Sequence, residues 1–152
     1  MIIREMSAAE CRELISSNRL GRLACAADRH PYVIPITYAY DKDAIYAFTL
    51  PGRKLETMRA NPHVALLVEQ LGHGYSWKTA LAEGAFEELP DQMGFKHSRE
   101  RAWSLLSTQT RWWEPGGVKP FQPPYTGGIS YVFFRIRVDQ VSGREALEEA
   151  GA

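Results

Sequence analysis

The sequence predicts a mainly β or α+β fold, a small antiparallel β-barrel of six strands with peripheral helices. Runs rich in β-branched and aromatic residues recur along the chain, and short turn sequences separate them. Three segments of helical composition are scattered among these runs. Six strands joined by short connections are typical of a small barrel, with the helices added around it.

The composition is that of one ordinary globular domain over residues 1–152. With 45% hydrophobic and 24% charged residues, the chain can bury a core without metal or disulfide staples. Its 18 basic and 18 acidic residues cancel, so no long-range field draws it to nucleic acid or to anionic lipid. We find no signal peptide and no apolar segment of membrane-spanning length, and we expect a cytoplasmic protein with neither nucleic-acid nor membrane partners.

The first helix is predicted from a capping box. The Ser7 hydroxyl can accept a hydrogen bond from the amide of Glu10, whose side chain reaches back to Ser7. An apolar stripe at i, i+3 and i+4 follows, formed by Cys11, Leu14 and Ile15. We expect Cys11 to be a small buried hydrophobe and not a reactive thiol. Residues 18–21 end this helix.

Three strands follow, over residues 20–26, 32–40 and 44–49, with a turn at 28–31. Residues 41–43 form a tight connection, so the third strand is expected to return as the hairpin partner of the second. Pro35 lies inside the second strand. Because proline cannot donate to a β-ladder, we expect an edge, a bulge or a ligand-facing gap there.

The rest of the chain alternates between helix and strand. Helices are predicted over 53–60, ended by Asn61-Pro62, and over 91–107; strands are predicted over 64–68, 77–89 and 129–141. Gly84 indicates a bulge or a close approach within its strand. Residues 108–128, which include Trp112 and Trp113, have irregular composition, and the tail over 145–152 is expected to be frayed.

Residues 49–55 carry the most informative chemistry. A strand ends at Thr49, Gly52 opens the backbone, and Arg53 and Lys54 begin a helix whose free amides attract anions. A solvated basic helix start explains the same residues, and short motifs often match by chance. However, cations at a helix N-terminus oppose its dipole unless an anion neutralises them, which favours an anion site.

Other kinds of site have little support. The four histidines lie far apart, there is no Cys-x-x-Cys spacing, and we expect no metal site. No P-loop or Gly-x-Ser-x-Gly elbow occurs. His73, between two glycines, is most simply a solvated loop residue.

Five stretches, taken in order, resemble the pyridoxamine 5′-phosphate oxidase-like FMN-binding split barrels, and within them the branch of nitroimidazole-resistance proteins. They are Gly21-Arg22-Leu23-Ala24, residues 31–40, residues 45–49, Gly52-Arg53-Lys54-Leu55 and Arg59-Ala60-Asn61-Pro62. The likeness covers residues 7–88 and returns near 133–143.

The resemblance implies a six-stranded split barrel that forms a homodimer, with FMN bound in each of two clefts between the subunits. Carried over by position, Val33, Ile34, Pro35 and Ile36 line the isoalloxazine, Phe48 and Thr49 lie by the ribityl chain and phosphate, and Arg53 and Lys54 bind the phosphate. The partner subunit would reach the flavin near Trp77, with Lys78 or Thr79 as polar contacts. Trp77 is equally well explained as a core or interface anchor.

The function that this resemblance implies is an FMN-dependent oxidoreductase acting on a small substrate, such as an aromatic or nitro-bearing molecule. No motif supports any residue as the catalytic acid or base. Residues 108–128 do not match the substrate-binding signature of true pyridoxamine phosphate oxidases, and His73 is the nearest candidate for the histidine that nitroimidazole-resistance proteins carry near the flavin. A flavin-binding or sensory module without turnover, or the same barrel with F420 or haem, are the alternatives.

Overall fold

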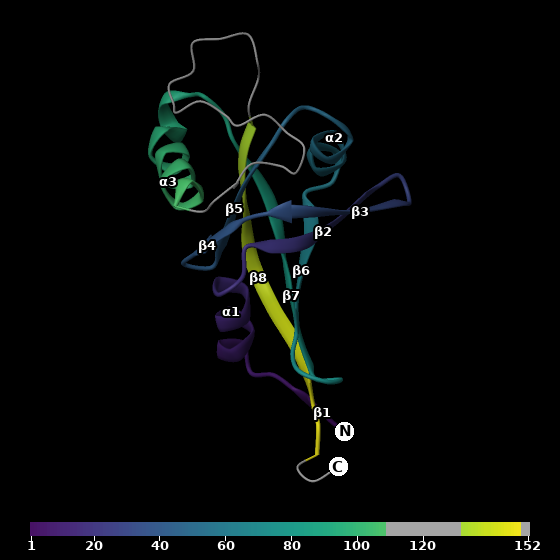
Figure 1. Cartoon of the computed structure of the whole chain (residues 1–152). Coiled ribbons are helices and arrows are strands. Elements are labelled where there is room, and N and C mark those ends of the chain that lie inside the picture. Colours follow the sequence, from purple (N-terminus) through teal and green to yellow (C-terminus); the bar gives the residue numbers. More distant parts are fainter. Residues whose placement is uncertain (109–131, 150–152) are drawn as a thin grey trace.

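The computed structural model describes residues 1–108 and 132–149, and one antiparallel sheet dominates them (Figure 1). Its strands are β1 (Ile2–Glu5), β2 (Leu20–Ala27), β3 (His30–Thr37), β4 (Ala39–Asp41), β5 (Ala44–Thr49), β6 (His63–Leu71), β7 (Trp77–Leu89) and β8 (Val132–Leu147). The helices are α1 (Ala8–Ser16), α2 (Arg53–Ala60) and α3 (Lys96–Ser107), with a 3₁₀ turn over Met93–Phe95. The strand order is β3-β2-β6-β7-β8-β5-β4, and β1 pairs with β8.

The sheet curls into a barrel that stays open on one side. β3 stands at one end of the strand order and β5 near the other, and yet residues of β3 and β5 contact each other. No ladder joins these two strands among the described residues, so the barrel is split between them. The predicted antiparallel split barrel is confirmed. The predicted number of strands is too low, because β1 was not foreseen and residues 32–40 divide into two strands.

The division falls at Tyr38 and corrects the predicted hairpin. β3 pairs with β2 along its whole length, from Leu20 opposite Thr37 to Ala27 opposite His30. Of β3 and β4, only β4 pairs with β5. The hydroxyl of Tyr38 donates to the carbonyl oxygen of Ile15 at 2.6 Å. This buried bond to the end of α1 redirects the chain between the two strands.

Pro35 is tolerated because β3 is an edge strand. Pro31 and Pro35 lie opposite Ala26 and Arg22 of β2, and two prolines cannot donate to a ladder. These positions are therefore the non-hydrogen-bonded pairs of the ladder. Val33, between them, turns its backbone N–H and C=O to the open edge, and its side chain is 60% exposed. Of the three explanations considered for Pro35, the structure shows the edge.

Two apolar clusters hold the helices onto the sheet. The capping box is present as predicted, because Glu10 N donates to Ser7 Oγ at 3.2 Å and Ser7 N donates to Glu10 Oε2 at 2.7 Å. The stripe of Cys11, Leu14 and Ile15 is buried in the larger cluster. The smaller cluster lies under α3 and includes Phe48 and Phe133. Phe133 is thus fully buried under α3, and its neighbour Phe134 is fully buried in the larger cluster.

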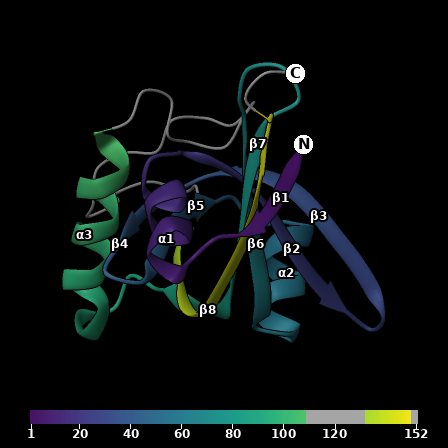
Figure 2. The same cartoon turned by 90° about the horizontal axis from the view of Figure 1, so that it is seen from below.

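The helices cover different sides of the sheet. In Figures 1 and 2, α1 and α3 lie on one side of the long β7–β8 pair and α2 lies on the other. α1 packs on β7 and β8, α3 packs on β4 and β5, and α2 packs on β2. None of the helices in the described ranges is long and apolar enough to cross a membrane.

Two further boundaries differ from the prediction. Residues Glu145, Ala146 and Leu147 are not frayed: they belong to β8 and pair with Arg4, Ile3 and Ile2 of β1. Glu145 is buried and forms an ion pair with Arg4 at 2.5 Å.

The helix expected over 91–107 begins at Lys96, after the 3₁₀ turn. The expected loop with Trp112 and Trp113, and the expected strand start at 129–131, lie outside the described residues.

The bulge predicted at Gly84 is present and gives a test of the sheet. The β7–β8 register shifts between Glu83 and Gly84, and a Cβ at Gly84 would collide with the carbonyl oxygen of Arg137. We expect Gly84→Ala to lower the free energy of unfolding by about 1–3 kcal/mol in urea titrations. Gly94→Ala is the control, because no described atom lies within 4 Å of a Cβ there. Equal stability of the two variants would contradict the described register.

Candidate functional site

The candidate site lies where the end of β5, the first turn of α2 and the β2–β3 hairpin meet. Lys54 Nζ donates to Thr49 Oγ1 at 3.3 Å, which joins α2 to β5. The Arg53 guanidinium carbon lies 4.4 Å from the centroid of the Tyr32 ring, which joins α2 to β3. Residues 49–54 thus bring two cations and a hydroxyl to one side of the split, where Tyr32 of the more distant β3 meets them.

The local sequence explains why α2 begins and ends here. Gly52 precedes the helix with an extended backbone, and no side chain caps the first turn. Leu55 and Met58 are fully buried and fix the helix against the barrel. At the other end, Asn61 Nδ2 donates to the Ala26 carbonyl oxygen at 2.9 Å, which ties the helix end to β2. The Asn-Pro pair thus has a structural role.

The two cations of the first turn differ in their surroundings. Lys54 is 5% exposed and Thr49 is 1% exposed, so burial of the lysine stem fixes the position of its ammonium. Arg53 is exposed, and no carboxylate among the described residues forms an ion pair with it. Arg59, on the same helix, is bound by Glu56 and Glu88. Arg53 can therefore offer its N–H groups to an external anion.

A neutral thiol lies beside this cation pair. Cys25 is buried, and burial raises the pKa of its thiol, while the nearby charges of Lys54 and Arg53 lower that pKa by a smaller amount. A thiol with a raised pKa is a poor nucleophile. The arrangement therefore indicates anion binding and gives no support to covalent catalysis by Cys25.

The structure brings to this place most of the residues that were predicted to line the isoalloxazine or to bind the ribityl chain and phosphate. Thr49, Arg53 and Lys54 are adjacent, and β3, which carries Val33, Ile34, Pro35 and Ile36, runs along the open edge beside them. Phe48 differs: its ring packs on Phe133 with 5.7 Å between the ring centroids, and it is buried in the cluster under α3. Only the backbone of Phe48 is available to a ligand in this arrangement.

Lys78 and Thr79 lie at the opposite end of the sheet. β6 begins at His63, directly after α2, and Lys78 pairs with Gln70. Seven residues of β6, a length of about 23 Å, separate His63 from Gln70. Lys78 Nζ lies 3.4 Å from Glu145, near β1 at the bottom of Figure 1. His73 lies beyond this end, exposed in the β6–β7 turn, as the solvated-loop interpretation predicted. One chain does not bring Lys78 to the cation pair.

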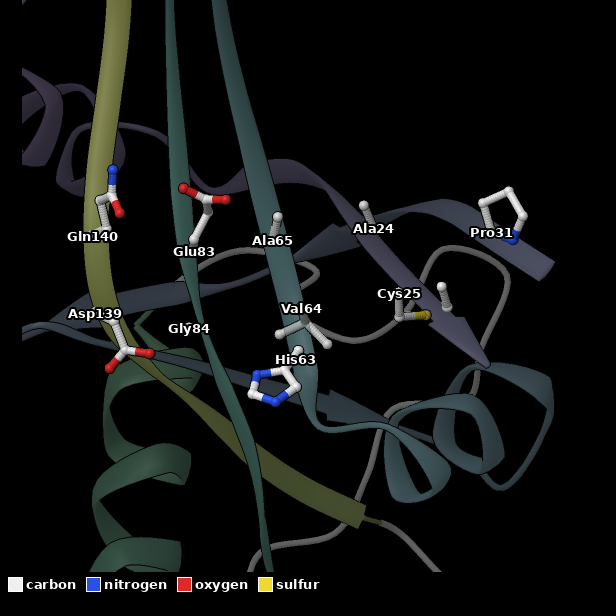
Figure 3. Close-up of a pocket in the computed structure, with 11 residues that line it drawn as sticks. Ala24, Cys25, Pro31, His63, Val64, Ala65, Glu83, Gly84, Asp139 and Gln140 are labelled. Carbon is white, nitrogen blue, oxygen red and sulfur yellow. The ribbon is translucent and has the colours of Figure 1, made fainter. Parts of the chain in front are cut away.

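A shallow cavity of about 500 Å³ opens beside the site, on the face of the sheet (Figure 3). Small residues such as Ala24, Ala65 and Gly84 line its centre, Cys25 and Pro31 lie at one end, and Asp139 and Gln140 lie at the other. No group of three potential metal ligands occurs among the described residues. This cavity and the role of Tyr32 were not identified from the sequence, because the cavity depends on how five strands pack together and the Tyr32 contact depends on how α2 packs against β3.

Comparison with known proteins assigns the family. The model of the family described as pyridoxamine 5′-phosphate oxidase matches residues 7–145. A FAD-binding protein of Mesorhizobium loti, solved by crystallography, is 48% identical, with 97% of this chain and 99% of that chain covered and a TM-score of 0.79. An uncharacterised protein of Rhizobium meliloti (strain 1021) is 40% identical over 96% of this chain and 97% of its own length.

The nitroimidazole-resistance branch shares the fold. A protein of Bacteroides thetaiotaomicron named for 5-nitroimidazole antibiotic resistance has a TM-score of 0.68 over 95% of this chain and 89% of its own, at 17% identity. That likeness concerns the fold alone. The match over residues 7–145, together with the two closer relatives, shows that this chain belongs to the pyridoxamine 5′-phosphate oxidase family.

Proposed function

We propose that this protein binds FMN by its phosphate at the first turn of α2 and is an FMN-dependent oxidoreductase acting on a small substrate. The observation that carries the proposal is Arg53. Its guanidinium lies on Tyr32, pairs with no carboxylate of the described residues, and adjoins the buried Lys54. The family, and a 48% identical relative that is a FAD-binding protein, support a flavin as the anion.

The charges and donors of the first turn fit a phosphate. The amides at the start of α2 have no side-chain cap, and the helix dipole adds partial positive charge there. Arg53 can bind two phosphate oxygens with its planar fork, while Lys54 acts as a point charge held next to the Thr49 hydroxyl. A phosphate supplies the negative charge that the start of a helix favours, and it gives Arg53 an anionic partner that the described residues do not.

The open edge of β3 fits the flavin ring. Val33 presents its backbone N–H and C=O to this edge, and such groups can bind the polar rim of an isoalloxazine. Pro35, which has no N–H, leaves a carbonyl acceptor without a competing donor. When bound, the flavin supplies hydride and electron transfer, and the protein binds and orients it. We assign no acid or base.

The positions of Lys78 and Thr79 support a homodimer. Both lie at the far end of the sheet from α2, so a flavin held by Arg53 and Lys54 would meet these residues only from a second copy of the chain. We propose that two copies form two equivalent sites, each completed by the partner.

The cofactor and its use are tested together. Protein as isolated is expected to be yellow, with the absorption bands of an oxidised flavin, and chromatography of the released cofactor is expected to show FMN. FAD is the second candidate, because the 48% identical relative is a FAD-binding protein. A haem or F420 spectrum would contradict the proposal. Anaerobic mixing with NADH and NADPH separates an enzyme, whose flavin is bleached, from a binding module, whose flavin stays oxidised.

The proposed binding of the phosphate by Arg53 and Lys54, here called the phosphate grip, predicts a selective loss of affinity for FMN. Arg53→Ala and Lys54→Ala are each expected to weaken FMN binding by about 1.5–3 kcal/mol, roughly 10- to 150-fold in Kd, because each removes a charge-assisted bond. Binding of riboflavin, which has no phosphate, should change little in fluorescence titrations. Lys96→Ala is the matched control, since Lys96 also begins a helix and is exposed. Unchanged FMN affinity in both variants would disprove the grip.

The shared site predicts a characteristic result for mixed dimers. A Lys54→Ala subunit and a Lys78→Ala subunit, co-expressed with different tags, form a dimer with one site intact and the other carrying both changes. We expect half of the sites to bind FMN with wild-type affinity. If both residues served the same subunit's site, every site would carry one change, and no wild-type affinity would be measured.

A further inference from the structure

We infer that Tyr32 is a positioning residue for phosphate recognition: its ring holds the guanidinium of Arg53 flat, so that the N–H edges of Arg53 face the bound anion. This inference rests on the proposed flavin function and concerns how the site selects a phosphorylated flavin over an unphosphorylated one.

The Arg53 guanidinium lies over the ring of Tyr32. With 4.4 Å between the Arg53 guanidinium carbon and the Tyr32 ring centroid, the group lies within the range of a cation–π interaction. Such a contact uses the planar face of the guanidinium, whereas hydrogen bonds leave from its edges. Tyr32 can therefore hold Arg53 without using any of the donors that a phosphate requires.

Arg59 shows the alternative means of fixing an arginine on the same helix. Its guanidinium is held by carboxylates, with Nε 3.2 Å from Glu88 Oε2 and Nη1 3.3 Å from Glu56 Oε1. Those bonds fix the side chain but occupy its donors. Arg53 has no carboxylate partner among the described residues, and stacking on Tyr32 restricts its rotamers at no cost in donors. A side chain ordered in advance loses less entropy when the anion binds.

The position of Tyr32 is itself fixed. Asp28 and Arg29 make the tight β2–β3 turn in left-handed conformation, with φ of 49° and 63°, and Tyr32 follows opposite Cys25 in the ladder. The half-buried ring therefore lies close to a tight turn, on a strand that is paired with β2 along its whole length.

The test compares FMN with riboflavin in variants at position 32, with Kd measured by fluorescence titration. Tyr32→Phe retains an aromatic face and is expected to retain the wild-type preference for FMN, and Tyr32→Trp should retain or increase it. Tyr32→Leu is expected to weaken FMN binding by about three- to tenfold and to leave riboflavin binding unchanged. Tyr32→Met, a second variant without a ring, should behave in the same way if the leucine variant does not fold.

A double-mutant cycle identifies the residue through which Tyr32 acts. In an Arg53→Ala background, Tyr32→Leu should cause no further loss of FMN affinity. Equal losses for FMN and riboflavin, or a full loss that persists without Arg53, would overturn the inference and leave the phosphate grip intact. If the wild-type protein itself binds FMN no more tightly than riboflavin, the proposed function fails instead.

Discussion

The open edge of β3 is the constraint on which the rest of the structure depends. Pro31 and Pro35 cannot donate to a second ladder, so the sheet stops at β3 and the barrel cannot close onto β5. The split leaves the first turn of α2 beside the β2–β3 hairpin. Arg53 can therefore lie on Tyr32 while Lys54 reaches Thr49. The same two prolines thus explain why the sheet stays open at this side of the barrel, where we propose that a ligand binds.

The site combines a rigid frame with a small number of charges. Leu55 and Met58 bury one face of α2, and Asn61 ties the end of the helix to β2, so these contacts position the first turn beside the split. Formal net charge is zero over the chain, and a local cluster of donors must therefore hold any anion. The distance between α2 and Lys78 gives the proposed dimer a physical reason: the polar groups of one ligand site would come from opposite ends of the same sheet in two copies.

The sequence predicted the features whose causes are local. The capping box at Ser7, the tight connection at residues 41–43, the bulge at Gly84 and the bounds of α2 follow from neighbouring residues or from one glycine. The missed features depend on distant contacts. β1 exists because Ile2 pairs with Leu147, and the division at Tyr38 depends on a bond to Ile15. The contact between Tyr32 and Arg53 likewise depends on how α2 packs against a hairpin, which spacing along the chain does not encode.

A crystal structure of the protein with FMN tests the central claim most directly. The account predicts the phosphate between the Arg53 guanidinium edges, the Lys54 ammonium and the first amides of α2, with the Lys78 side chain nearest to that flavin belonging to a second copy. A phosphate bound elsewhere, with Arg53 and Lys54 facing solvent, would contradict it.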